Sequence, residues 1–179
     1  MLLHGWRTDN VRGTMYALSQ PPVAKVETLI RRPPHDVFSA FVEPATLTKF
    51  WLAAASAPLE LGKTIHWEFL VPGASADAVV KVLDAPTRIV IDWSDGTNVE
   101  WTFTERTGQG TVVVVTQSGF TGSADEMVAQ ALDATGGFSL VLSDLKALLE
   151  QGKVVNLVRD KAALIEDERA QGAASLSSS

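Results

Sequence analysis

Apolar and polar residues alternate with a period of two through the middle of the chain. The first alternating segment begins at residue 63 and has two sets of side chains, Ile65, Trp67 and Phe69 on one face and His66 and Glu68 on the other. Such alternation is typical of a strand with one buried face. Similar runs follow at residues 77–83, 88–94, 99–105 and 111–118, separated by turn sequences such as Asp-Gly and Gly-Gln-Gly. With a further strand expected at residues 24–31, the pattern predicts a curved antiparallel sheet of about six strands.

Apolar residues at helical spacing come directly after the first expected strand. Pro33 and Pro34 suit a first helical turn, and Val37, Phe38 and Phe41 then recur at helical intervals. Pro44 is expected to end this helix, and a second short helix follows at residues 46–51. Two short helices therefore connect the first strand to the rest of the sheet.

A long helix is expected to begin after Ser123. Ser123 and Glu126 have the spacing of a capping box, in which each side chain binds an otherwise free backbone N–H of the other residue. Apolar residues keep a helical period as far as Gln151, and Gly152 is placed to end the helix in the left-handed conformation. The predicted fold class is α+β, with this long helix packed across a curved antiparallel sheet.

Two adjacent glycines, Gly136 and Gly137, interrupt the long helix. Together they cost about 2 kcal/mol of helix propensity relative to alanine, so we expect a compensating role. One interpretation is close packing of the helix on the sheet. The other is a kink or an opening toward the interior of the protein.

Both ends of the chain differ from the patterned region. Residues 1–22 show no clear period and end in two prolines, so we expect an irregular leader, within which Met15 is an alternative start of the protein. Residues 161–179 are expected to form a polar tail, of which 172–179 are small and polar enough to be disordered. The folded domain is therefore placed at residues 23–160.

Charge and composition exclude several classes of function. The 179 residues suit one domain, and the formal net charge of -6 with no clustered basic face argues against nucleic acid as a partner. Without cysteine there is no disulfide, thiolate metal site or thiol nucleophile. Charged residues near the start interrupt any signal peptide, and no apolar run is long enough to span a membrane, so we expect a cytoplasmic protein.

Several short motifs, in their order along the chain, carry a resemblance to a known family. They are Pro33-Pro-His-Asp-Val-Phe-Ser-Ala-Phe41, Phe50-Trp-Leu52, Leu61-Gly-Lys63, Val99-Glu-Trp-Thr-Phe103, Ser118-Gly-Phe120, Gly136-Gly-Phe138 and Leu145-Lys-Ala-Leu-Leu-Glu150. Together they resemble the START-like (SRPBCC) ligand-binding superfamily, in the branch related to the C-terminal domain of heat-shock protein 90 ATPase activators. The resemblance covers about residues 23–160.

The resemblance implies a helix-grip fold but does not by itself imply one function. Members of the superfamily hold hydrophobic ligands, some are aromatases or cyclases of polyketides, and others modulate a chaperone. Residue-level chemistry therefore has to separate these alternatives.

The sequence offers no convincing catalytic or metal site. His66 and Glu68 share a strand face, but the opposite face carries three large apolar side chains, so we expect the polar pair to face solvent. By the same alternation, Asp92 and Glu100 face outward. The histidines lack ligand spacing, and neither an activated-serine motif nor a phosphate-binding loop is present, so no cofactor is indicated.

Aromatic residues on the concave face are the strongest functional candidates. We expect a pocket lined by Trp67, Phe69, Trp93, Trp101, Phe103, Thr116, Thr135, Phe138, Val141 and Leu142, with Phe50, Trp51 and Leu52 at its lip. The rings supply flat apolar surface, and the two threonines would supply a few polar contacts, as small-molecule sites usually require.

These residues favour a non-enzymatic protein that encloses a small, largely apolar molecule between the sheet and the long helix. The alternatives are a chaperone-regulating interaction module and an aromatase or cyclase, for which no catalytic residue stands out. Self-association is also left open, because the run from Val112 to Val115 places apolar residues on both faces of a strand. Val113 and Val115 are taken as the outer pair that a second subunit would cover, giving a homodimer.

Overall fold

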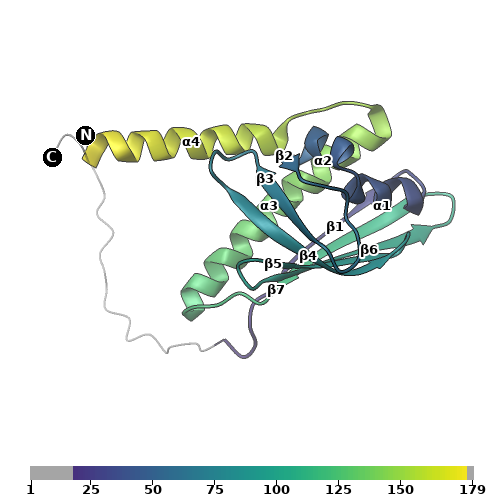
Figure 1. Ribbon diagram of the computed structural model, residues 1–179, viewed down its shortest axis with the longest axis horizontal. Coiled ribbons are helices and arrows are strands. Elements are labelled where there is room, and N and C mark those ends of the chain that lie inside the picture. Colours follow the sequence, from purple (N-terminus) through teal and green to yellow (C-terminus); the bar gives the residue numbers. More distant parts are fainter. Residues whose placement is uncertain (1–17, 177–179) are drawn as a thin grey trace, which may run out of the picture.

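A seven-stranded antiparallel sheet forms the body of the protein, and helices lie against one of its faces (Figure 1). The computed structural model describes residues 18–176. The strands are β1 (Ala24–Ile30), β2 (Leu52–Ala55), β3 (Thr64–Phe69), β4 (Ser75–Asp84), β5 (Arg88–Trp93), β6 (Asn98–Arg106) and β7 (Gly110–Ser118). Their order is β1-β7-β6-β5-β4-β3-β2, so the first strand pairs with the last. The predicted α+β helix-grip fold is confirmed.

Strand β2 is the one strand that the sequence pattern did not predict. Its sequence, Leu-Ala-Ala-Ala, has no polar alternation and no β-branched residue, so it gives little strand signal. The strand pairs with β3 at the edge of the sheet, and the register shifts between Leu52 and Ala54. The other six strands coincide closely with the predicted segments.

Helices α1 (Pro34–Val42) and α2 (Pro44–Phe50) are the two short helices expected after β1. Each has a proline in its first turn, where the missing N–H costs no helical hydrogen bond. Pro44 therefore begins α2 as well as ending α1. The side chains that α1 buries include Val37, Phe38 and Phe41, as the helical spacing predicted.

Helix α3 (Ala124–Gln151) is the predicted long helix, and both of its ends have the expected caps. The Ser123 hydroxyl accepts a hydrogen bond from Glu126 N–H at 3.3 Å, and Glu126 Oε2 accepts one from Ser123 N–H at 2.7 Å. Hydrogen bonds from the Ser123 backbone and then from its hydroxyl lower the pKa of Glu126. Gly152 ends the helix with φ +67°, a left-handed conformation that glycine adopts without strain.

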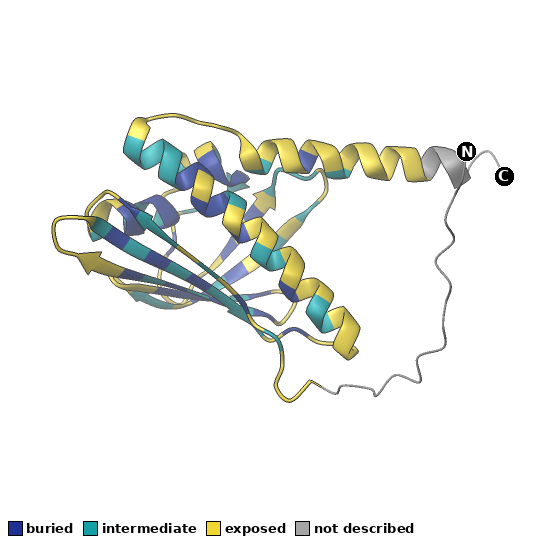
Figure 2. Cartoon of the chain, turned by 180° about the vertical axis from the view of Figure 1, so that it is seen from behind, coloured by how far each residue is buried: buried dark blue, intermediate teal, exposed yellow. Residues whose placement is uncertain are grey.

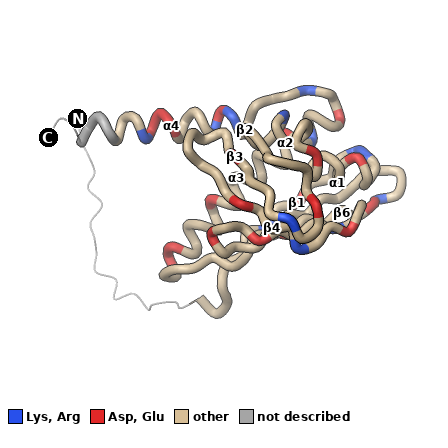
Figure 3. The backbone as a smooth tube through the Cα atoms, in the orientation of Figure 1, with Lys and Arg blue, Asp and Glu red and all other residues tan. Residues whose placement is uncertain are grey.

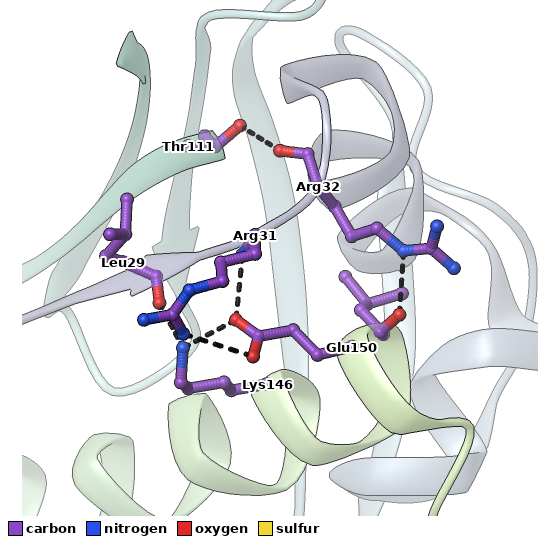
Figure 4. A network of polar contacts seen from close by, with 7 residues as sticks. Leu29, Arg31, Arg32, Thr111, Lys146 and Glu150 are labelled. Carbon is purple, nitrogen blue, oxygen red and sulfur yellow. Dashed lines mark hydrogen bonds and ion pairs between the residues drawn. The ribbon is translucent and has the colours of Figure 1, made fainter. Parts of the chain in front are cut away.

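A polar network holds the C-terminal end of α3 against β1 and the β1–α1 turn (Figure 4). Arg31 N–H donates to Glu150 Oε1 at 2.8 Å, and Lys146 Nζ donates to the same oxygen at 2.5 Å and to a backbone carbonyl of β1. Arg32 Nε donates to the carbonyl of Leu149 at 2.7 Å. The sheet and the last turn of α3 are therefore joined by charge-assisted hydrogen bonds.

Glu150 is the acidic centre of this network, and its side chain is 14% exposed. Partial burial raises the pKa of Glu150. Hydrogen bonds from Lys146 and from the Arg31 backbone, together with both positive charges, lower the pKa by more than burial raises it. The net pKa lies below the ordinary glutamate value, so the carboxylate is ionised wherever the protein is near neutral pH.

A second long helix, α4 (Leu157–Leu176), follows α3 in the region where the sequence predicted a polar tail. It runs away from the sheet, and most of its surface is exposed (Figures 1 and 2). The expected domain end at residue 160 falls inside this helix, and residues 172–176, expected to be disordered, are helical. Residues 177–179, and residues 1–17 with the alternative start Met15, lie outside the described part of the chain.

Asp144 of α3 fixes the start of α4. Its carboxylate is 4% exposed and accepts hydrogen bonds from the N–H groups of Leu157 and Val158, each at 3.0 Å. These N–H groups have no partner within α4, so Asp144 acts as a helix cap supplied by another helix. Asn156, just before α4, has φ +64°, which turns the chain into the new helix.

The core lies between the sheet and helices α1 to α3. Inward positions of the strands are apolar, namely Ile65, Trp67, Ala78, Val80, Ile89, Ile91, Trp93, Val99, Trp101, Phe103, Val113 and Val115. Val113 and Val115 are fully buried, so their expected outward orientation is wrong. Val112 and Val114, which are half-buried, form the outer pair. Self-association through the outer face of β7 stays a prediction, but Val112 and Val114 would be the residues that a second subunit covers.

Candidate functional site

Trp51 lies at the centre of a group of aromatic rings between the sheet and α3. Its backbone leaves α2 with φ -139° and ψ -54°, so the residue belongs to neither a helix nor a strand. Its ring is in contact with five others, at centroid distances of 5.1 to 6.5 Å: those of Phe41, Trp67, Phe69, Trp101 and Phe138. Most of these pairs are tilted or edge-to-face, the arrangements that aromatic rings prefer.

Five of the predicted lining residues come together in this group. They are Trp67, Phe69, Trp93, Trp101 and Phe138, and with Trp51 we call them the aromatic cluster. Trp93 joins it through Trp67 at 5.2 Å and Phe69 at 5.9 Å, and Phe138 of α3 lies 6.2 Å from Trp101. The cluster therefore links β3, β5 and β6 to the long helix, as the concave-face prediction required.

Three further predicted lining residues are buried but lie beside the cluster. Val141 and Leu142 of α3 belong to the same hydrophobic core. Phe103 instead packs under α1, with its ring centroid 5.5 Å from Phe38 and 5.8 Å from Phe41. It therefore supports the first short helix and lies outside the ring contacts of Trp51.

The two predicted polar contacts are not available inside the protein. Thr116 of β7 pairs with Lys25 and Glu100, both outward-facing, so its side chain lies on the outer face of the sheet. Thr135 is half-buried, and its hydroxyl donates to the carbonyl of Ala131 at 2.7 Å within its own helix. Neither threonine therefore supplies a polar contact to the aromatic cluster.

The three residues expected at the pocket lip are part of the core. Phe50, Trp51 and Leu52 are 3%, 6% and 1% exposed. A position after two short helices suggested an exposed rim, but β2 pairs with β3 and carries this segment inward. The central position of Trp51 was therefore missed, although an adjacent Phe and Trp at a helix end were a signal for it.

Gly136 and Gly137 face solvent in the middle of α3. Both are exposed, and a Cβ atom built on either would have no neighbour within 4 Å. Close packing on the sheet therefore does not explain them, and neither glycine opens toward the interior. Helix α3 continues through them without interruption.

A small hollow lies beside Trp51, where α2, α3 and α4 meet. Its volume is about 10 Å³, room for about one water molecule. Trp51 and Leu70 line it together with Asp144, Asn156 and Arg159. A larger open groove, of about 390 Å³, lies at the β1–α1 and β6–β7 turns, away from the aromatic cluster. Uptake of a molecule by the cluster would therefore require side chains to move.

Two buried donors in the aromatic cluster have no hydrogen-bond partner in the part of the chain that the structure describes. Trp67 and Trp101 are each 1% exposed, and the Nε1–H group of each faces no acceptor. Among the described residues, the other polar side chains of the interior are bonded: Thr97 donates to Asp95, and Thr111 donates to the carbonyl of Arg32. An unmet buried donor costs about 1–3 kcal/mol, so these two indoles are exceptional for the fold.

Titratable groups of the sheet lie on its outer face. His66 pairs with Asp77 at 2.8 Å, and Arg88 donates to Glu100 at 2.6 Å. The expected outward orientation of His66, Glu68, Asp92 and Glu100 agrees with their exposed or half-buried positions. Within the described residues no group of three or more His, Cys, Asp or Glu side chains could hold a metal ion. Lys and Arg (blue) and Asp and Glu (red) both occur along the described backbone (Figure 3).

The part of the chain that contains the aromatic cluster matches a known protein family. Residues 31–150 match the family model described as Activator of Hsp90 ATPase homolog 1-like protein. The chain belongs to this family. The match begins at the β1–α1 turn and ends at Glu150 in the polar network, so it contains the whole aromatic cluster and excludes α4.

Solved structures agree with the AHSA1-like assignment. The protein SSP2350 from Staphylococcus saprophyticus is 28% identical, with a TM-score of 0.65 over 75% of this chain and 96% of that one. The Aha1 dimer from Colwellia psychrerythraea is 22% identical, with a TM-score of 0.64 over 74% and 98%. DynU16, from the dynemicin biosynthetic locus, is 21% identical with a TM-score of 0.65, but only 48% of its chain is covered. No curated protein sequence is significantly similar to this one.

None of the described helices is both long enough and apolar enough to cross a membrane.

Proposed function

We propose that this AHSA1-like protein is a non-enzymatic binding protein that encloses a small, largely apolar molecule between the sheet and α3. The observation that carries the proposal is the aromatic cluster itself. Six rings from β3, β5, β6, α3 and the α2–β2 junction meet at one place, where flat apolar surface favours a flat apolar ligand.

The two ends of α3 are held by different contacts. The C-terminal end of α3 is held by the network around Glu150, whereas its N-terminal half packs through Ala131 against the small residue Ala24 and against Phe120. Gly136 and Gly137 separate these two halves and lower the helix propensity between them. The proposal is that the N-terminal half of α3 moves to admit the ligand while the C-terminal end stays in place.

The direct test is native mass spectrometry of the purified protein, followed by thermal shift with a library of apolar aromatic compounds and lipids. A ligand present at a hundred times its dissociation constant should stabilise the fold by about 2.7 kcal/mol. Failure to find a bound species, together with no thermal shift from any compound, would contradict the proposal.

A matched pair of variants locates the binding. Phe138→Leu removes a ring that contacts both Trp51 and Trp101, and should weaken binding about 2- to 10-fold. Val114→Thr changes a half-buried residue on the outer face and should bind as the wild type does. Equal effects of the two substitutions would place the ligand outside the aromatic cluster.

A second candidate is a chaperone-regulating interaction module, favoured by the family to which the chain belongs. The α3–α4 connection and α4 also expose apolar side chains, with Val154 50% and Leu164 58% exposed. Stimulation of the ATPase of heat-shock protein 90, with a complex on a sizing column, would support it. Loss of both effects in Leu164→Lys, with ligand binding unchanged, would assign them to this surface.

A further inference from the structure

The interior contains two hydrogen-bond donors to which residues 18–176 supply no acceptor. Trp67 of β3 and Trp101 of β6 are each 1% exposed, and their Nε1–H groups have no acceptor. A buried indole N–H normally finds a partner, because leaving it unmet costs as much as losing a hydrogen bond. The fold bonds its other buried polar side chains, including Asp144, whose carboxylate accepts two N–H groups.

Both indoles are in contact with the ring of Trp51. The centroid of Trp51 is 5.1 Å from that of Trp67 and 6.1 Å from that of Trp101. The indole of Trp51 has an N–H donor but no hydrogen-bond acceptor, so it cannot accept a hydrogen bond through a ring atom from either donor. Small side chains lie beside Trp67 on the neighbouring strand β4, where Ala76 is its direct partner and Ala78 is also inward.

Trp51 also borders an existing gap in the packing. It lines the hollow where α2, α3 and α4 meet, and it follows the last residue of α2 in an irregular backbone conformation. Its backbone N–H donates to the carbonyl of Leu47 at 2.9 Å, and it lies outside the strand pairing that holds Trp67 and Trp101. Because the hollow holds only about one water molecule, an incoming molecule would have to displace Trp51 to reach the two indoles.

We infer that the molecule taken up by the aromatic cluster carries a hydrogen-bond acceptor oxygen, as an aryl ketone or quinone does, and that Trp67 or Trp101 Nε1–H donates to it in the place that Trp51 now fills. The inference rests on the proposed function and adds to it the chemical class of the ligand. A purely hydrocarbon ligand would leave both donors unmet, whereas an oxygen acceptor removes that cost without any charged residue.

The test compares two compounds of the same size, 1-indanone and indane, which differ in one carbonyl group and have about the bulk of the Trp51 indole. Their dissociation constants are measured with the wild-type chain and with Trp51→Leu, which enlarges the space. The indole N–H signals are followed by ¹⁵N–¹H NMR and assigned with Trp67→Phe and Trp101→Phe. These two substitutions remove the donor and keep an aromatic ring.

We expect the ketone to bind about ten-fold more tightly than the hydrocarbon, as one hydrogen bond to an unmet buried donor predicts. The ketone, and not the hydrocarbon, should move the Trp67 or Trp101 indole signal downfield. The phenylalanine variant at the responding position should lose the ten-fold preference for the ketone over indane, whereas Val114→Thr on the outer face should keep it.

Two results overturn the inference in distinguishable ways. Equal affinity for the two compounds, with no selective indole shift, would show that water or ring faces hold the donors, and the proposed function would survive. Binding of neither compound to the wild type or to folded Trp51→Leu would count against the proposed function as well.

Discussion

Replacing both solvent-facing glycines of α3 by alanine should stabilise the protein. Gly136 and Gly137 lie inside a continuous helix, are exposed, and have room for a Cβ atom without any neighbour within 4 Å. Nothing therefore opposes the gain in helix propensity, which is about 0.8–1.0 kcal/mol for each position. The double variant should unfold with a free energy about 2 kcal/mol higher than that of the wild type.

Urea unfolding followed by circular dichroism measures this difference directly. A gain of about 2 kcal/mol should raise the urea midpoint by about 1 M and the melting temperature by about 4–8 °C. Gly152→Ala is the matched control, because Gly152 has φ +67°, where a Cβ atom is strained. That variant should lose about 1 kcal/mol.

A midpoint that stays the same or falls in the double variant would refute the reasoning. It would mean that α3 approaches another part of the chain closely at one of the two positions, and the single variants would show which. Under the proposed function the double variant should also admit ligand more slowly, since a stiffer α3 resists the opening. Stopped-flow measurement of Trp fluorescence quenching reports that rate.

Three further outcomes are expected. Asp144→Ala leaves two N–H groups of α4 without their acceptor, so unfolding should cost about 2 kcal/mol less and the amides at the start of α4 should exchange faster. Glu150 has a lowered pKa in the folded state, so its contribution is complete above the unfolded value of about 4.3 and is lost as pH falls through the folded value. The urea midpoint of Glu150→Gln should accordingly fall less steeply over that range than the wild-type midpoint. Gly110→Ala places a Cβ atom against the carbonyl of Ile30 at φ +124°, and a loss of about 3 kcal/mol or more in the free energy of unfolding is expected; a near-neutral result would contradict this close approach.

Alternation of apolar and polar residues predicts the buried face of a strand only where polar residues mark the outer face. In β3, His66 and Glu68 mark the outer face, so Trp67 was placed correctly on the inner one. In β7 four consecutive valines carry no polar marker, so only the pairing with β1 and β6 decides that Val113 faces inward. Thr116 was misplaced for the same reason.

The two elements that the sequence did not predict depend on tertiary contacts. Helix α4 turns a narrow stripe toward the body, chiefly Val158 and Ala162, and its cap is a carboxylate on another helix. Local periodicity does not contain that information. Strand β2 is short and rich in alanine, and Trp51 became central because β2 pairs with β3 beside it.

The cap at Asp144 also fixes the direction in which α4 leaves the body of the protein. Its 20 residues extend about 30 Å from the point where two hydrogen bonds set its orientation. A fluorophore attached near Gln171 would thus sit at the far end of a lever whose pivot lies beside the hollow that Trp51 lines. A small rotation of α4 at Asp144 would displace this end of the helix by a much larger distance. The anisotropy of the fluorophore would therefore report movement around Trp51.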